Sequence, residues 1–178
     1  ARGMEIEDRE LKNLLEQIDR AGGCVDITLG ESTYKNITSG NKPTSNPKAD
    51  FILYDQDNKA QIFISHKDVK GFQQYAGITV FKENPEVKVF VEDIKRLTVG
   101  ILISKTTFQR DIEDKDLQLN AIYGHDNEFG INRVQIVCQG EMELVKLDEN
   151  TYTIKSQHDF IHPYIPEDHF KPKLLVTY

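Results

Sequence analysis

The chain has 178 residues, of which 38% are hydrophobic and 29% charged, and its formal net charge is −7. That length fits a single domain with a sizeable hydrophobic core, and the negative charge argues against a protein that coats nucleic acid through bulk charge. We expect no membrane helix, because no apolar run approaches the roughly 20 residues that such a helix needs.

The first part of the chain predicts one helix and one strand. Apolar residues recur at helical spacing over residues 5–21, and the glycine pair that follows is a typical helix end. Residues 24–29 alternate enough for a short strand. Residues 30–46 are rich in Gly, Ser, Thr, Asn and Lys, so we expect a long loop there.

The centre of the chain predicts a β-hairpin followed by a helix. Its strands cover residues 51–54 and 61–65, and the Asp- and Asn-rich segment 55–59 is typical of a turn. Residues 68–76 predict a helix that ends at a glycine, and residues 78–81 predict a further strand.

The remainder predicts one more long helix, over residues 86–97, although the β-branched residues of its first half also fit a strand, and further strands follow. The apolar segment 98–104 fits either a strand or a continuation of that helix, and residues 108–122 are polar and mixed. Further strands are predicted at 134–138, 142–147 and 151–154, with a hairpin turn at 148–150. We therefore predict one α/β or α+β domain over residues 1–178, with a central mixed sheet flanked by helices and a β-rich part at 130–178.

The segment 47–79 contains the most compact set of residues with possible chemistry. Asp50 opens the first hairpin strand, and Ser65 and Lys67 close the second. Side chains two apart in a strand point to the same face, so Ser65 and Lys67 share a face, while the carbonyl of His66 stays available as a metal ligand. A carboxylate and a lysine at the ends of paired strands are the groups that metal-dependent phosphodiester cleavage uses.

Charge is distributed unevenly along the chain. Residues 34–82 contain seven lysines against four aspartates, whereas the segments before and after have an excess of acids. Local positive charge attracts phosphate even where net charge does not. The predicted site therefore lies in the basic part of an acidic chain.

The motif Pro47-x-x-Asp50 with Ser65-x-Lys67 resembles that of the PD-(D/E)xK nuclease superfamily, which includes restriction endonucleases and junction resolvases. The run from Phe72 to Gly77, Phe-Gln-Gln-Tyr-Ala-Gly, is similar to members from phage and restriction systems. The superfamily pattern has an acidic residue where this chain has Ser65. The resemblance covers roughly residues 40–80 and implies a restriction-endonuclease-like core.

The resemblance also implies roles for individual residues. Asp50 and the His66 carbonyl would bind Mg²⁺, with Mn²⁺ as a substitute, and Lys67 would orient the attacking water or stabilise charge. Ser65 would hold a metal-bound water. A glutamate of the first helix, Glu7 or Glu10, would complete the ligand set. Contacts to DNA are expected from Lys42, Lys48, Lys70, Gln73 and Gln74.

These features predict a metal-dependent DNA endonuclease. The alternative is a catalytically silent nuclease fold that serves as a DNA-binding or protein-interaction module of a phage or defence system, which Ser65 favours. A sugar- or protein-binding β-rich domain is a third reading, and a zinc site among His158, His162 and His169 is disfavoured by the nearby prolines.

Partners and compartment follow from the same observations. DNA is the expected partner, a homodimer is possible, and no membrane association is expected. Only two cysteines are present, Cys24 and Cys138, both in apolar strand-like runs where we expect buried thiols. With no secretory leader in the sequence, these thiols predict a reducing compartment, and the resemblance implies the cytoplasm of a bacterial or phage-infected cell.

Overall fold

The structure is a computed structural model that describes residues 2–44, 48–70, 73–100, 106–125, 132–167 and 170–177, with side chains described from residue 5 onward. The chain forms two compact units where the sequence predicted one domain. The first unit comprises Ala1–Phe72 and Tyr123–Tyr164, and the second comprises Gln73–Ile122 and Ile165–Tyr178. The segment 47–79, which carries the nuclease-like motif, is therefore divided between the two units.

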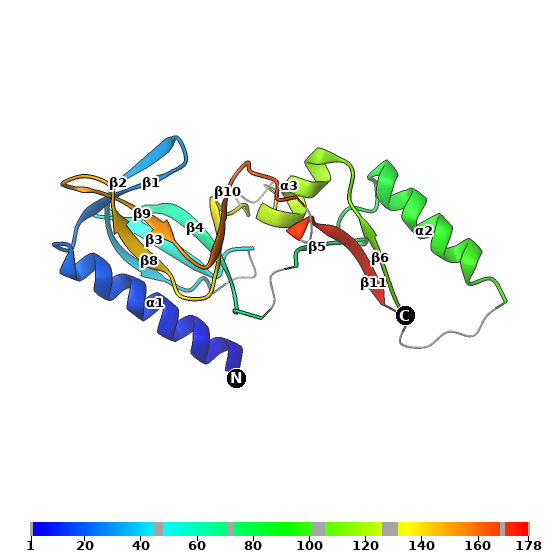
Figure 1. The fold of residues 1–178 in the computed structure, drawn as a ribbon, viewed down its shortest axis with the longest axis horizontal. Coiled ribbons are helices and arrows are strands. Elements are labelled where there is room, and N and C mark those ends of the chain that lie inside the picture. Colours follow the sequence, from blue (N-terminus) through cyan, green and yellow to red (C-terminus); the bar gives the residue numbers. More distant parts are fainter. Residues whose placement is uncertain are drawn as a thin grey trace. The chain divides into compact units, whose positions relative to one another are not determined.

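An eight-stranded mixed sheet forms most of the first unit (Figure 1). Two of its strand pairs, β4 with β7 and β1 with β9, are parallel and the others are antiparallel. Both parallel pairs join segments that lie far apart in the sequence. In spatial order the strands are β10 (His158–Ile161), β7 (Ile136–Gln139), β4 (Ala60–Lys67), β3 (Phe51–Asp55), β2 (Ser32–Asn41), β1 (Val25–Leu29), β9 (Thr151–Lys155) and β8 (Glu143–Lys146).

Helix α1 (Arg2–Arg20) packs on one face of this sheet and confirms the first predicted helix. Its apolar stripe, with Leu14 and Ile18 fully buried, forms a common core with Phe51 and Ile64 of the central strands. The helix begins a few residues earlier than predicted and ends at the glycine pair, where both residues have positive φ. Helix α1 therefore covers one face of the sheet.

Strand β2 corrects the prediction of a long loop over residues 30–46. Only Ile37 of this strand is fully buried, so the sequence lacks the apolar alternation that marks a strand. The strand forms because it lies between β1 and β3 and pairs with both through its backbone. A bulge at Asn36, whose φ is +57°, bends β2 and lets its main-chain N–H donate to the buried Asp26 carboxylate at 2.9 Å.

The second unit contains helix α2 (Pro85–Leu97), most of helix α3 (Lys115–Tyr123) and a three-stranded sheet. The sheet order is β5 (Tyr75–Gly77), β11 (Lys173–Thr177) and β6 (Thr107–Asp111). Its core consists of Val87, Phe90 and Ile94 of α2 with residues of α3 and β11. Asn84 caps α2 by accepting the main-chain N–H of Glu86 at 2.8 Å, which confirms the second long helix and its start.

The prediction of a helix over residues 68–76 is wrong for the described part of that segment. Residues 73–74 are irregular and Tyr75–Gly77 form β5, which pairs in parallel with β11. Local helical spacing is outweighed here by backbone pairing with a strand from the far end of the chain. Residues 71–72 lie outside the described residues.

The strand predicted over residues 78–81 is wrong. Residues 78–81 form turns, with the N–H of Phe81 bonded to the carbonyl of Gly77 at 3.3 Å. In the segment 98–104, Thr98 closes α2 through its N–H to the carbonyl of Ile94, and residues 101–104 lie outside the described residues. The strands predicted at 134–138, 142–147 and 151–154 correspond to β7, β8 and β9, and the mixed α+β class is confirmed. The restriction-endonuclease-like core stays a prediction.

None of the described helices has the length and apolar character to cross a membrane.

Candidate active site

Asp50 lies where β3 begins and meets the end of β4. The N–H of Asp50 donates to the carbonyl of Ile64 at 2.8 Å, so backbone pairing extends one residue beyond Phe51. The Asp50 carboxylate in turn accepts the main-chain N–H of His66 at 2.7 Å through Oδ2. Asp50 therefore lies at the level of Ser65, and the two ends of the predicted hairpin come together.

Strand alternation places Ser65 and Lys67 on the face of the sheet opposite α1. Phe51 and Ile64 are paired and both belong to the core under α1. The side chains of Ser65 and Lys67 alternate with those of Ile64 and His66 and therefore leave on the opposite face. Ser65 is buried there, whereas Lys67 is only partly covered. The sequence-based expectation that Ser65 and Lys67 share a face fits this register.

Lys48 brings a second positive charge to Asp50 and Lys67. Burial of the Lys48 ammonium, followed by repulsion from Lys67, lowers the pKa of Lys48 from 10.5 to about 8, while Asp50 opposes this shift. The N–H of Lys48 donates to Oδ1 of Asn132 at 2.7 Å, which fixes its backbone. One carboxylate and two lysines thus share a small volume at the β3–β4 end, an arrangement suited to a negatively charged ligand.

Strand β7 secures the end of β4. Lys67 pairs with Gln139 in the parallel register, and the Lys67 carbonyl accepts the N–H of Gly140 at 2.9 Å. The buried Gln139 amide donates to the carbonyls of Asp68 and Val69 at 3.2 and 3.0 Å. These bonds hold the segment that follows Lys67.

Two histidines complete the support at the strand ends. Oε1 of Gln139 accepts a hydrogen bond of 2.7 Å from Nδ1 of His158. The His66 side chain points to the α1 face, where its Nε2 lies 2.7 Å from the Gly140 carbonyl oxygen. Since a carbonyl oxygen can only accept, Nε2 is the donor. Sequence reasoning missed Gln139 and His158 as supports, since a parallel partner strand so distant in the chain carries no local signal.

The two glutamates expected from the first helix do not accompany Asp50 in the described structure. Glu7 lies 3.7 Å from Nζ of Lys42, and Lys42 also donates to Asp8 at 3.0 Å, which raises the Lys42 pKa. Glu10 is 7% exposed, with one carboxylate oxygen 3.9 Å from Nε of Arg9. Glu7 and Asp8 therefore hold Lys42 at α1, and Glu10 lies buried beside Arg9.

The other residues that were predicted to contact DNA are divided between the two units. Lys70 is exposed in the turn after β4. Gln73 and Gln74 belong to the second unit. The Gln73 amide donates to the carbonyls of Gln74 and Lys171 at 3.0 and 2.7 Å, and Gln74 is buried. The Gln73 side chain therefore serves the structure of its own unit.

The donor set at Asp50 fits a weakly held cation rather than a dedicated metal cage. Among the described residues, no group of three or more His, Cys, Asp or Glu side chains is arranged to hold a metal ion. Mg²⁺ in phosphoryl-transfer sites commonly takes one or two carboxylates, with water and substrate phosphate supplying the other ligands. Asp50 supplies one such carboxylate.

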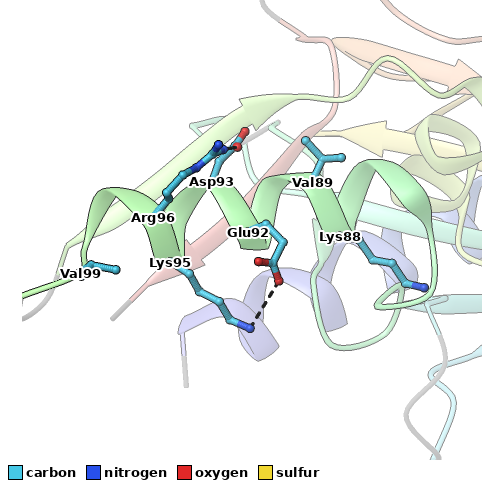
Figure 2. A pocket seen from close by; sticks show the side chains of 7 residues that line it. All are labelled: Lys88, Val89, Glu92, Asp93, Lys95, Arg96 and Val99. Atoms are coloured by element: carbon cyan, nitrogen blue, oxygen red, sulfur yellow. Dashed lines mark hydrogen bonds and ion pairs between the residues drawn. The ribbon is translucent and has the colours of Figure 1, made fainter.

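A separate hollow of about 530 Å³ lies on helix α2 (Figure 2). Its charged side chains are largely paired with one another: Lys95 with Glu92 at 3.7 Å, and Arg96 with Asp93. Asp93 also accepts from Arg110 at 2.8 Å. Exposed Val89 and Val99 lie at the two ends of the hollow, so it offers neither a free charge cluster nor a nucleophile.

Comparisons with protein families, curated proteins and solved structures found no match to this chain. The functional proposal therefore rests on Asp50, Lys67 and Lys48 and on the backbone that holds them.

Proposed function

We propose that the protein is a Mg²⁺-dependent DNA endonuclease that hydrolyses phosphodiester bonds at the β3–β4 end of the first unit. The observation that supports this most is the hydrogen bond from the His66 N–H to the Asp50 carboxylate, with two lysines beside it. A phosphodiester needs its charge neutralised and its leaving oxygen stabilised, and lysines near a carboxylate serve those needs.

Each residue has a distinct role in this proposal. Asp50 and the His66 carbonyl hold the cation, which when bound neutralises the phosphate and lowers the pKa of a water molecule. Lys67 stabilises the charge that develops on the phosphate oxygens. Lys48 binds the adjacent phosphate, and the Ser65 hydroxyl holds a water molecule. Gln139 positions the chain that follows Lys67.

The test is cleavage of supercoiled plasmid and of single-stranded DNA with Mg²⁺ or Mn²⁺. We expect metal-dependent cutting that Asp50→Ala and Lys67→Ala each reduce by about 100-fold or more. The matched controls are Asp57→Ala and Lys59→Ala in the exposed β3–β4 turn, which should cut like the parent. The absence of cutting on both substrates by a folded parent protein would refute the proposal.

The second candidate is a DNA-binding module without catalysis, and the single carboxylate favours it, because Ser65 stands where the nuclease motif has an acid. In that case the protein binds DNA without metal, and Lys48→Ala and Lys67→Ala weaken binding while Asp50→Ala does not. Either function fits a DNA-associated protein in the cytoplasm of a bacterial or phage-infected cell. A homodimer suits a two-fold symmetric duplex target.

A further inference from the structure

An exposed aromatic ring lies on the same face of the sheet as Ser65 and Lys67. Ser65 pairs with Val137 of β7, and Val137 pairs with Phe160 of β10. Paired residues project from the same face of a sheet. Ser65, Val137 and Phe160 therefore form a buried row on the face opposite α1, and the Tyr164 ring packs on Phe160 with centroids 5.6 Å apart.

The backbone at Tyr164 is fixed while its ring stays accessible. The Tyr164 carbonyl accepts the hydroxyl of Tyr123 at 2.6 Å, and its N–H donates to the carbonyl of Ile161 at 2.9 Å. Tyr164 is nevertheless 57% exposed, whereas Phe160 and Tyr123 are buried. The buried rings thus support one exposed ring in a defined position.

The distance to the candidate site suits a strand of nucleic acid. Three strand spacings separate Asp50 at β3 from Phe160 of β10, and neighbouring strands lie about 4.8 Å apart, so Tyr164 stands roughly 15–20 Å from Asp50. Nucleotides in one strand of a duplex rise about 3.4 Å each, so this distance corresponds to about five nucleotides.

We propose that Tyr164, supported by Phe160, is a stacking platform for an unpaired base of single-stranded DNA whose backbone lies at Asp50, Lys48 and Lys67. This inference rests on the proposed function and names its substrate class. In a duplex, the bases stack on one another and do not present their faces to a side chain. An unpaired base does, and aromatic rings beside a cationic backbone site are how proteins hold single strands. Tyr164 is a specificity-determining residue that selects single-stranded over fully paired DNA.

The first experiment measures binding in EDTA, so that no cleavage enters the result. Fluorescence anisotropy with a labelled oligo-dT and with a labelled hairpin duplex compares the parent with three variants. Tyr164→Ala should bind oligo-dT at least about fivefold more weakly, since a base stacked on an aromatic ring contributes on the order of 1–3 kcal/mol. Tyr164→Phe should restore binding. Tyr75→Ala, an exposed tyrosine of the second unit, should bind like the parent.

A second readout detects stacking directly. The chain has no tryptophan, so Tyr164→Trp introduces a single tryptophan at the platform, which is excited selectively at wavelengths beyond tyrosine absorption. Oligo-dT should quench its fluorescence, while the same titration of Tyr75→Trp should leave the signal unchanged. A variant that merely disturbs packing would not produce this difference.

The outcomes separate this inference from the nuclease proposal. Loss of oligo-dT binding in Tyr164→Ala, with hairpin binding unchanged, supports the platform even when no DNA is cut. Equal oligo-dT binding by Tyr164→Ala and the parent refutes the platform even when DNA is cut. No oligo-dT binding by the parent, or equal weakening for oligo-dT and hairpin, also refutes it.

Discussion

Gly124 lies directly against Lys48. A methyl group at Gly124 would come within 3.0 Å of Cβ of Lys48 and within 2.4 Å of the carbonyl oxygen of Asn132. Gly124 also has a φ of +84°, a backbone conformation that residues other than glycine rarely adopt. The position of Lys48 in the candidate site therefore depends on a glycine in a different part of the sequence.

Gly124→Ala is expected to destabilise the protein by roughly 2–4 kcal/mol. Left-handed strain alone costs about 1–3 kcal/mol, and the contact with Asn132 adds to it. The matched control is Gly100→Ala, where φ is +73° but nothing lies within 4 Å of the added methyl group. Urea unfolding of both variants measures the difference, and equal destabilisation would show that Gly124 makes no close contact.

Lys48→Met should stabilise the protein at neutral pH. The folded pKa of Lys48 is about 8 against 10.5 for a free lysine, so the unfolded chain binds more protons between these values and the parent becomes more stable as the pH rises through them. At pH 7 the full cost of burying the charge is present, and we expect a gain of roughly 1–3 kcal/mol for the variant.

The gain from Lys48→Met should shrink as the pH rises from 8 to 10.5. Urea unfolding at pH 7, 8, 9 and 10 measures it, with Lys59→Met in the exposed β3–β4 turn as the control. A gain that does not change with pH would mean that Lys48 is not desolvated.

Asp26→Asn should destabilise the protein at pH 7 by about 1–3 kcal/mol, because a hydrogen bond to a charged group is worth roughly that much. The main-chain N–H of Asn36 lowers the pKa of Asp26 below 3.8, with a smaller contribution from Lys35 at 3.1 Å. The stabilisation is present above pH 3.8 and is lost as the pH falls through the lowered pKa. Thermal unfolding should therefore give a difference between variant and parent at pH 7 that declines below pH 4. A constant difference down to pH 2 would contradict this account.

The two cysteines should differ in reactivity. Burial raises the pKa of the Cys138 thiol to about 12, whereas Cys24 is only partly buried. Because the thiolate is the reactive form, iodoacetamide at pH 8 should modify Cys24 and leave Cys138 intact. Mass spectrometry of the folded protein should then find one adduct, against two in urea. Equal modification of both cysteines without urea would show that the β7 core opens readily.

The features that could be predicted from the sequence are local. The hairpin and its turn were predicted because the apolar strands flank an Asp- and Asn-rich segment, and the turn residue Asn58 has a φ of +62°. That hairpin is enough to bring Asp50 close to Ser65, and helices α1 and α2 follow from the helical spacing of their apolar residues.

The features that were missed depend on pairing between distant segments. Strand β2 has few apolar residues and forms because it has a neighbour on each side. Gln73 and Gln74 were assigned to a helix, yet Tyr75, which follows them, pairs with Lys173. The contact of Lys48 with Gly124 and Asn132 joins segments whose sequences give no sign of meeting. Glu10 was a candidate metal ligand from its place in the first helix, whereas the structure places it buried beside Arg9.

The parallel pairing of β4 with β7 has a consequence for synthesis on the ribosome. Ile64 finds its partner Ile136 only after the chain has passed through most of the second unit. Until then, one edge of β4 has exposed backbone groups and the apolar side chains of Ile62 and Ile64. Such an edge is a template for pairing with other chains. Nascent chains that stall between Lys67 and Ile136 should therefore depend on chaperones more than the finished protein does.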